Sequence, residues 1–159
     1  MNSDQQSASG REESTHGGPL GGMRVLDLTD HRGDSGPWIL GELGADVIKV
    51  EPPQGCTTRA ALPIREGDDS DIRSLHFAAY SSNKRSITLD SSKDEDRETL
   101  RELIASTDFL YESGLPSATE EIGFSHDGLL EINPELVHVI VTPFGLSGPR
   151  ADVRIASSR

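Results

Sequence analysis

Ser35 is the first side chain of this sequence whose setting suggests chemistry. It lies in GDSGP, residues 33–37, which invites comparison with the nucleophile loop of a serine protease. A serine nucleophile needs a general base from a distant segment, whereas His31 lies almost beside Ser35 in the chain. We therefore interpret Ser35 and Gly36 as the loop that leads into a helix, and we assign no catalytic residue here.

Two short basic stretches could meet a phosphate. Arg32 and Gly33 come just before the expected helix, and a helix N-terminus attracts phosphate through its free N–H groups and its dipole. A surface arginine and a turn glycine are the alternative interpretation, and the residues alone leave both open. Lys84 and Arg85 form a compact basic pair in an acidic chain, which could neutralise phosphates or balance nearby acids.

The remaining reactive residue types form no recognisable site. Cys56 has no obvious base beside it, so we interpret it as an incidental thiol. The sequence contains no H-E-x-x-H, C-x-x-C or Walker pattern, and we expect no metal. His138 alternates within an apolar strand and is predicted to be a packed residue. The five histidines show no metal-ligand spacing: His16, His31, His76, His126 and His138.

The stretch from Arg24 to Pro53 must position the loop around Arg32. Its β-branched segments, Arg24–Thr29 and Asp46–Glu51, are typical of buried parallel strands. Pro37 suits the first turn of a helix between them, and Gly44 suits its end. The helix would cover the sheet with Trp38, Ile39, Leu40 and Leu43. Ligands of open α/β sheets bind at the carboxyl ends of strands, where the loop Asp30–Gly36 lies.

The rest of the chain continues the alternation of strands and helices. A long loop after Pro52 leads to a short helical turn at Leu75–Tyr80. Ser92 and Glu95 fit a capping box for the clearest helix, whose core stripe is Leu100, Leu103 and Ile104. A short helix is expected at Ser125–Ile132. Further strands are expected at Ser86–Asp90, Asp108–Ser113 and Leu136–Phe144. This order predicts an α/β protein with a parallel sheet, one face of which stays bare beside the last strand.

Composition excludes several classes of partner. The 159 residues carry a formal net charge of −12, so we expect neither nucleic-acid binding nor docking on an anionic membrane. One cysteine allows no intramolecular disulfide and suits the reducing cytoplasm. No apolar run reaches the roughly 18 residues of a membrane span. Residues 1–18 lack the apolar core of a signal peptide and are expected to form a disordered tail.

Several motifs in order resemble one known family. GGMRVLDLTD, LGADVIKVEPP, SSNKRSITLD and INPELVHVIVTPFGLSGPRAD, with the spacing between them, are similar to the N-terminal part of class III CoA-transferases. This family includes formyl-CoA and carnitine CoA-transferases and α-methylacyl-CoA racemases. The resemblance covers residues 19–152 and leaves 153–159 as a truncated C-terminal end. It implies a Rossmann-like parallel sheet with flanking helices, incomplete relative to the family's full domain.

The resemblance also implies a ligand and its contacts. Family members hold coenzyme A (CoA), typically form interlocked dimers, and transfer CoA to a carboxylate through an aspartyl-CoA thioester. Carried over by position, Arg32 and Gly33 lie against the phosphate and pantetheine region of CoA. The adenine-contacting turn falls on Leu89, Asp90, Ser91 and Ser92. The remaining implied contacts are Ser113, Gly114, Leu115 and Arg154.

The sequence departs from the family pattern at several functional positions. A family arginine after the second strand is Pro52 here, and a basic or histidine position is Glu121. The catalytic aspartate of the family lies beyond Arg159. The histidine and aspartate of the racemases fall on Ala156 and Ser157. We therefore expect a CoA-binding N-terminal segment that is inactive alone.

Alternatives to that interpretation differ in chemistry. A racemase-like fragment would abstract a proton beside the thioester carbonyl. A non-catalytic CoA-binding or interaction domain would bind without turnover, and a degenerate remnant would bind no ligand. The expected partners are CoA or acyl-CoA, together with a second copy of the chain or a complementary C-terminal half.

Overall fold

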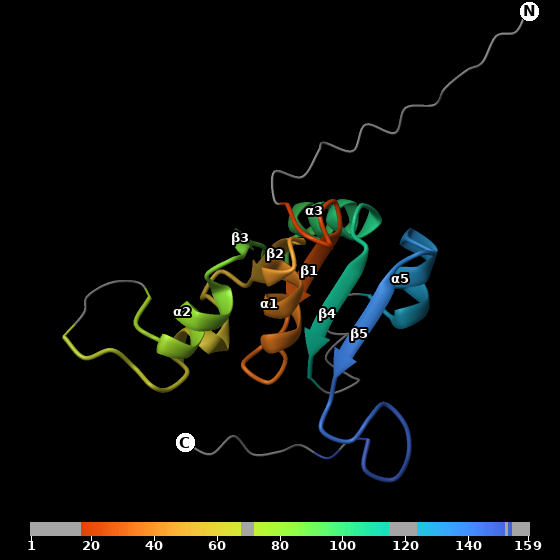
Figure 1. Cartoon of the computed structure of the whole chain (residues 1–159). Coiled ribbons are helices and arrows are strands. Elements are labelled where there is room, and N and C mark those ends of the chain that lie inside the picture. Colours follow the sequence, from red (N-terminus) through yellow and green to blue (C-terminus); the bar gives the residue numbers. More distant parts are fainter. Residues whose placement is uncertain (1–16, 68–71, 115–123, 152, 154–159) are drawn as a thin grey trace, which may run out of the picture.

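A five-stranded parallel sheet organises the computed structural model, which describes residues 17–67, 72–114, 124–151 and 153. The strand order is β3-β2-β1-β4-β5, and every pairing is parallel (Figure 1). From β1 the chain adds β2 and β3 on one side and then β4 and β5 on the other, so the strand order switches between β1 and β4, as in Rossmann-like folds. The predicted fold class is therefore confirmed. The strands are β1 (Arg24–Leu28), β2 (Asp46–Glu51), β3 (Arg85–Thr88), β4 (Phe109–Ser113) and β5 (Val137–Val141).

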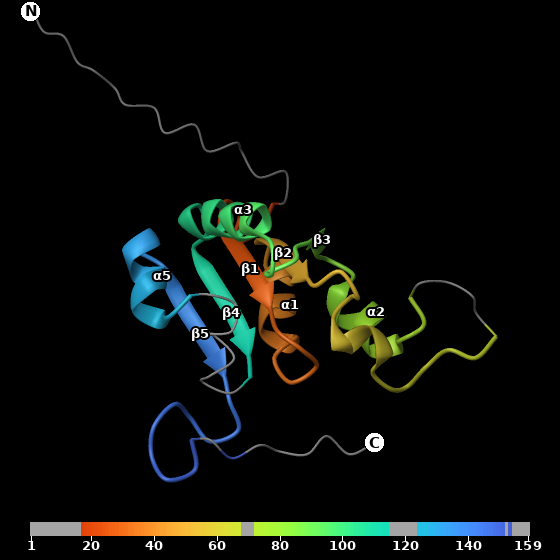
Figure 2. The same ribbon diagram turned by 180° about the vertical axis from the view of Figure 1, so that it is seen from behind.

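Helices cover the two faces of the sheet unequally. On one face lies α1 (Ser35–Glu42), with α2 (Leu75–Ser81) and the 3-10 turn η1 (Thr57–Ala60) beside it. On the other face lie α3 (Asp94–Ala105) and α5 (His126–Ile132), as the view from behind shows (Figure 2). In Figure 1 the α1 face of β4 and β5 carries no helix from the described ranges, and Val137 is 47% exposed.

The core lies mainly on the α3 face of the sheet. Leu26 on β1 is opposite both Ile48 on β2 and Leu110 on β4, and these side chains meet Leu100 and Ile104 of α3. Because side chains alternate along a strand, the neighbouring residues face α1 instead. The smaller cluster there contains Val25, Ala45 and Val47, with Leu20, Leu40, Phe109 and Tyr111 packed against it.

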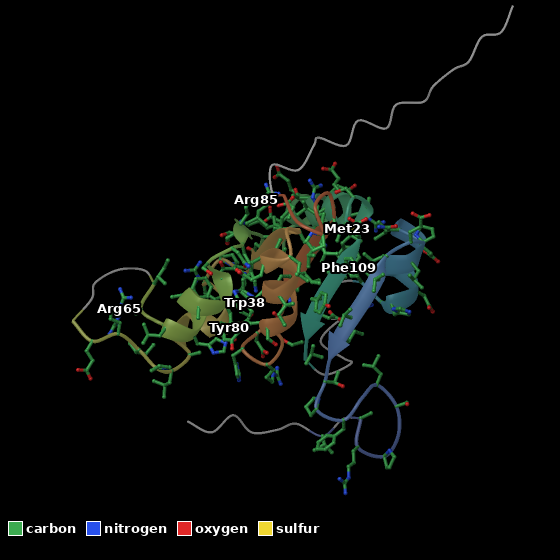
Figure 3. The ribbon with its side chains drawn as sticks, viewed as in Figure 1. Met23, Trp38, Arg65, Tyr80, Arg85 and Phe109 are labelled. Atoms are coloured by element: carbon green, nitrogen blue, oxygen red, sulfur yellow. The ribbon has the colours of Figure 1, made fainter. Side chains whose placement is uncertain are left out.

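The packing of α1 differs from the predicted apolar stripe. Leu40 packs against the sheet, but Ile39 and Leu43 are 49% and 40% exposed. The helix approaches the sheet through its smallest residue instead, since a Cβ added to Gly36 would lie 2.7 Å from the Tyr111 ring. Trp38 turns to the side and meets Tyr80 of α2 edge-on, with ring centroids 5.6 Å apart (Figure 3).

Helix ends confirm one expectation and correct another. Gly44 lies just after α1 and has a φ of +99°, a left-handed conformation that favours glycine. Its predicted place at the end of the helix is therefore confirmed. The capping box at α3 is wrong, because the N-cap is Lys93 and its side chain makes no capping bond. The Ser92 hydroxyl donates instead to Asp90 Oδ1, 2.6 Å away, so the Asp90 turn uses the group that would have capped the helix.

The last strand is shorter than the predicted Leu136–Phe144. Leu136 is buried before β5 begins, while Phe144 lies beyond its end and is 44% exposed.

At the other end of the chain, Gly18 packs against the backbone of Leu43 and Gly44. Most of the expected tail, residues 1–16, lies outside the described residues.

Candidate functional site

At the switch in strand order, the carboxyl ends of β1 and β4 bring two predicted segments together, and we name this place the β1–β4 crevice. The Ser113 hydroxyl, at the end of β4, accepts a hydrogen bond from the Asp30 backbone N–H (2.7 Å) and donates to Asp30 Oδ1 (2.8 Å). Gly33 fits the loop closely, since an added Cβ would lie 2.8 Å from Thr29 Cγ2. Strand order reverses here, which is where ligands of open α/β sheets bind.

Arg32 is held in this crevice by Asp30. Its Nε and Nη2 donate to Asp30 Oδ2 at 2.9 and 2.6 Å, and the side chain stays 40% exposed. Burial raises the pKa of Asp30, but hydrogen bonds from Arg32 and Ser113 outweigh burial and lower that pKa to about 2. The carboxylate thus stays ionised at neutral pH and fixes the direction of the guanidinium. A planar guanidinium held this way suits phosphate recognition.

The predicted adenine-contacting turn lies at the same end of the sheet. Leu89 follows β3, is buried, and donates its backbone N–H to the Glu51 carbonyl (2.9 Å). Asp90 Oδ1 accepts bonds from the backbone and hydroxyl of Ser92, while Ser91 and Ser92 are exposed. Since β3 lies two strands from β1, the turn is about 10 Å from the crevice across the sheet. An extended ligand would be needed to touch both.

Two predicted contacts cannot be placed. Leu115 and Arg154 lie outside the described residues, as does Glu121, whereas Gly114 follows Ser113 directly and donates its N–H to the Val141 carbonyl (3.2 Å). The crevice therefore joins Arg32, Gly33, Ser113 and Gly114, and the Leu89–Ser92 turn lies apart from them.

The basic pair Lys84 and Arg85 does not form a shared phosphate site. The Lys84 side chain is only 1% exposed and its Nζ contacts Asp27 Oδ2 at 2.7 Å. Arg85 pairs with Asp46 at the amino ends of the strands, far from the crevice (Figure 3). Both cations balance acids within the chain, one of them buried rather than solvated.

A buried charge network lies directly beneath the β1–α1 loop. Lys49 Nζ contacts Asp34 Oδ1 (3.0 Å), Asp27 Oδ2 (3.3 Å) and the Thr29 carbonyl (2.9 Å). The side chains of Asp27, Asp34 and Lys49 are each at most 1% exposed. Burial lowers the pKa of Lys49, but the charges of Asp27 and Asp34 outweigh burial and raise it. With Lys84, two cations thus neutralise two carboxylates.

This network anchors the start of α1 and so the loop that holds Arg32. Asp34 is the residue before α1, and the Thr29 hydroxyl lies 3.1 Å from Asp34 Oδ1. His76 of α2 reaches the same carboxylate, with Nε2 3.4 Å from Oδ2. The network was not predicted from the sequence. Its signal was a charged residue near the middle of two apolar strands, Asp27 in RVLDL and Lys49 in DVIKVE.

Other expectations concern reactive groups. Burial raises the pKa of the Cys56 thiol, and its backbone N–H donates to Glu51 Oε2 (3.2 Å). A protonated, half-buried thiol is a poor nucleophile.

The described residues contain no cluster of three side chains suited to hold a metal ion. Within the same residues, no helix has both the length and the apolarity to cross a bilayer.

Comparison with known proteins identifies relatives of this chain. A formyl-CoA:oxalate CoA-transferase of Streptomyces avermitilis is 40% identical over 136 residues, which are 85% of this chain and 32% of the relative. One from Streptomyces coelicolor is 42% identical, covering 82% and 31%. A succinate–glutarate CoA-transferase of Agrobacterium fabrum is 35% identical, covering 84% and 34%. This chain thus spans about a third of the length of these relatives.

Solved structures agree with the sequence relatives. A CAIB/BAIF family protein from Brucella suis superposes with a TM-score of 0.72 at 38% identity, covering 84% of this chain and 36% of that one. A hypothetical protein from Mycobacterium tuberculosis gives 0.73 at 29% identity, covering 89% and 38%. The model of CoA-transferase family III matches residues 20–155. The chain therefore belongs to CoA-transferase family III.

Proposed function

We propose that this chain is the CoA-holding N-terminal segment of a family III CoA-transferase. The observation that carries the proposal is the β1–β4 crevice, where Asp30 and Ser113 fix a partly exposed Arg32 beside a closely packed glycine. A phosphate of CoA would meet Arg32, and Gly33 would let the pantetheine approach the backbone. The relatives named above are CoA-transferases, which supports CoA as the ligand.

The proposed site extends along the carboxyl ends of the strands. Ser113 and Gly114 would line the crevice beyond Arg32, and the turn at Leu89–Ser92 would receive the adenine. The separation between turn and crevice suits an extended nucleotide such as CoA. From the resemblance, Leu115 and Arg154 complete the proposed contacts.

The chemistry we propose for the whole enzyme is CoA transfer between an acyl-CoA and a carboxylic acid. A carboxylate oxygen attacks the thioester carbonyl, the carbon–sulfur bond breaks, and CoA leaves as a thiolate. That thiolate then attacks the mixed anhydride at the enzyme carboxyl, forming the enzyme thioester and releasing the acyl group as a carboxylate. A covalent intermediate of this kind divides one difficult step into two easier ones.

The described carboxylates around the crevice are poor candidates for that nucleophile. Asp30 is committed to Arg32 and Ser113, and Asp27 and Asp34 are committed to buried lysines. We therefore propose that the reactive carboxylate comes from a polypeptide segment outside this sequence, and that the 159-residue chain alone turns nothing over. A cytoplasmic location is proposed from the single cysteine.

A complementary partner is part of this proposal. The α1 face of β4 and β5 presents Val137, Val139 and Val141, with Val137 47% exposed. An apolar strip of this kind favours a covering segment. We propose a C-terminal polypeptide matching the rest of the relatives' length as the cover, with a second copy of this chain as the alternative.

Calorimetry with CoA tests the site. We expect the chain to bind CoA, and Arg32→Ala to weaken binding about tenfold or more, because it removes a charge-assisted hydrogen bond. Arg101→Ala is the matched control, since Arg101 lies on α3 and its side chain is exposed. Equal affinity of wild type and Arg32→Ala would remove Arg32 from the site.

The second candidate function is a non-catalytic CoA-binding domain. It is favoured because each described carboxylate at the crevice already bonds to a cation or a hydroxyl. Assay of the chain mixed with its proposed partner separates the two. Transfer of CoA to an acid by the mixture supports the transferase segment, and binding without transfer supports the second candidate.

A further inference from the structure

Three titratable side chains form a hydrogen-bonded row on the α3 face of the sheet, away from the proposed CoA crevice. His138 Nε2, on β5, lies 2.9 Å from Glu112 Oε1 on β4. His138 Nδ1 lies 3.0 Å from His126 Nδ1, at the start of α5. We call Glu112, His138 and His126 the histidine latch, because their contacts join the start of α5 to β4 and β5.

The two rings meet end to end. Their centroids are 5.2 Å apart and their planes are inclined by 21°, while the two Nδ1 atoms are 3.0 Å apart. The centroid separation exceeds the nitrogen separation by about the sum of the two centroid-to-nitrogen distances within the imidazole rings. Both Nδ1 atoms therefore lie close to the line between the ring centres. A metal ion on that line would need about 2.0 Å to each nitrogen, or about 4 Å in all, and the nitrogens are only 3.0 Å apart. One shared proton fits instead.

Hydrogen-bond stoichiometry fixes how many protons the latch holds. A carboxylate only accepts, so His138 must carry hydrogen on Nε2. With both rings neutral, His126 Nδ1–H donates to the bare His138 Nδ1. With one added proton, His138 is charged beside Glu112 and donates its Nδ1–H to a bare His126 Nδ1. A second added proton places two N–H groups face to face, and the contact must open.

We infer that the histidine latch is a pH-sensitive link that holds the start of α5 on β4 and β5 and releases it when both rings are charged. Because both rings must carry an added proton before the contact opens, acidification favours release. The consequence reaches the core, because α5 carries Leu129, which is 1% exposed, onto the sheet.

The described elements packed around the latch are β4, β5, α3 and α5. The His138 side chain is 1% exposed and that of Glu112 is 9% exposed, so water has little access to the inner contact. From α3, Arg101 approaches α5 through Phe124, with 5.8 Å between guanidinium and ring centroid. Besides His126, the charged side chains of α5 are Asp127 and Glu131. The acid paired with Arg101 is Glu98.

Amide hydrogen exchange of the full chain tests the latch. We expect protection of residues 126–132, corrected for intrinsic exchange, to fall about tenfold between about pH 7.5 and about pH 5.5, the effect of losing one hydrogen bond of a charged group. Residues 94–105 of α3 serve as the internal reference. The proposal is overturned if α5 loses no more protection than α3.

Matched variants assign the effect to the rings. His126→Asn places an amide near the Nδ1 position and does not titrate, so its α5 should stay protected at both pH values. His31→Asn, an exposed histidine outside the latch, should behave as wild type. An acid loss in His126→Asn equal to that of wild type would contradict the inference.

Ring nitrogen shifts give a second measurement on the wild type, independent of any variant. At neutral pH only one of the two Nδ1 atoms should carry a proton. Finding both protonated or both bare would overturn the latch even if α5 exchanges as expected.

Discussion

Arg59 and Glu51 show at the scale of single residues how this chain secures the segment after β2. Arg59 Nε and Nη2 donate to the two oxygens of Glu51 at 2.6 and 2.8 Å, and the Ser86 hydroxyl donates to Oε1 (2.7 Å). The guanidinium also lies 4.2 Å from the Phe77 ring centroid. These contacts tie η1 and α2 to the β2–β3 edge that ends at the proposed adenine turn.

The Glu51 carboxylate gives a pH prediction. Hydrogen bonds from Arg59, and also from Ser86, lower the pKa of Glu51 from 4.5 to about 2 against the effect of burial. Because the folded pKa is lowered, the stability is present above the unfolded pKa and is lost as pH falls through the folded one. Glu51→Gln should lower the free energy of unfolding by about 1–3 kcal/mol at neutral pH. The gap to wild type should narrow between about pH 5 and pH 3.

Denaturant titrations across that pH range measure the gap. Glu98→Gln is the control, since Glu98 is 66% exposed in a surface pair and should change stability by less than about 0.5 kcal/mol. A gap that stays constant into acid would show that Glu51 stabilises the fold without its charge.

At the scale of elements, the buried network beneath the β1–α1 loop joins four of them. Lys49 comes from β2, Asp27 from β1, Asp34 precedes α1, and Lys84 precedes β3. Such a network costs desolvation, but its members satisfy one another, and removing one leaves a buried charge without its partner. We interpret it as the device that holds the Arg32 loop in a single position.

Lys49→Met tests that interpretation. The change leaves Asp27 paired with Lys84 but removes the only lysine that contacts the buried Asp34 carboxylate in the described residues. We expect the free energy of unfolding to fall by about 3–5 kcal/mol. Thermal unfolding measures the loss. Lys93→Met, at a side chain that is 66% exposed, should leave stability almost unchanged. A loss below about 1 kcal/mol for Lys49→Met would mean that the network contributes little.

The elements also show what sequence could predict. Strands β1, β2 and β4 follow from short apolar runs, and α3 from its stripe of Leu100 and Ile104, because local periodicity encodes burial. The packed character of His138 followed from its place in an apolar strand. The partners of Lys49 and Lys84 did not, since they lie 22 and 57 residues away and depend on strand register.

The candidate site likewise has features that could be predicted from the sequence and features that could not. Position after β1 predicted that Arg32 and Gly33 lie at the carboxyl ends of the strands, whereas Ser113 was predicted from the family resemblance. The pairing of Arg32 with Asp30 could not be predicted, because many neighbouring acids were available. The capping box at Ser92 failed for a similar reason, as Asp90 competes for the same hydroxyl.

At the scale of the whole molecule, the proposed CoA site and the proposed partner surface lie on different parts of the sheet. The carboxyl ends of all five strands lie together, while Arg85 and Met23 mark the opposite, amino end (Figure 3). Our central claim is that CoA lies across the carboxyl ends and that the reactive carboxylate is supplied by another polypeptide segment.

Amide chemical shifts recorded during a CoA titration test that claim most directly. The account predicts shifts at Arg32, Gly33, Ser113 and Gly114, with further shifts along Leu89–Ser92 and little change at the amino-end residues Arg24, Asp46 and Arg85. Shifts confined to the amino ends of the strands, or no shifts at CoA concentrations that saturate its family relatives, would contradict it.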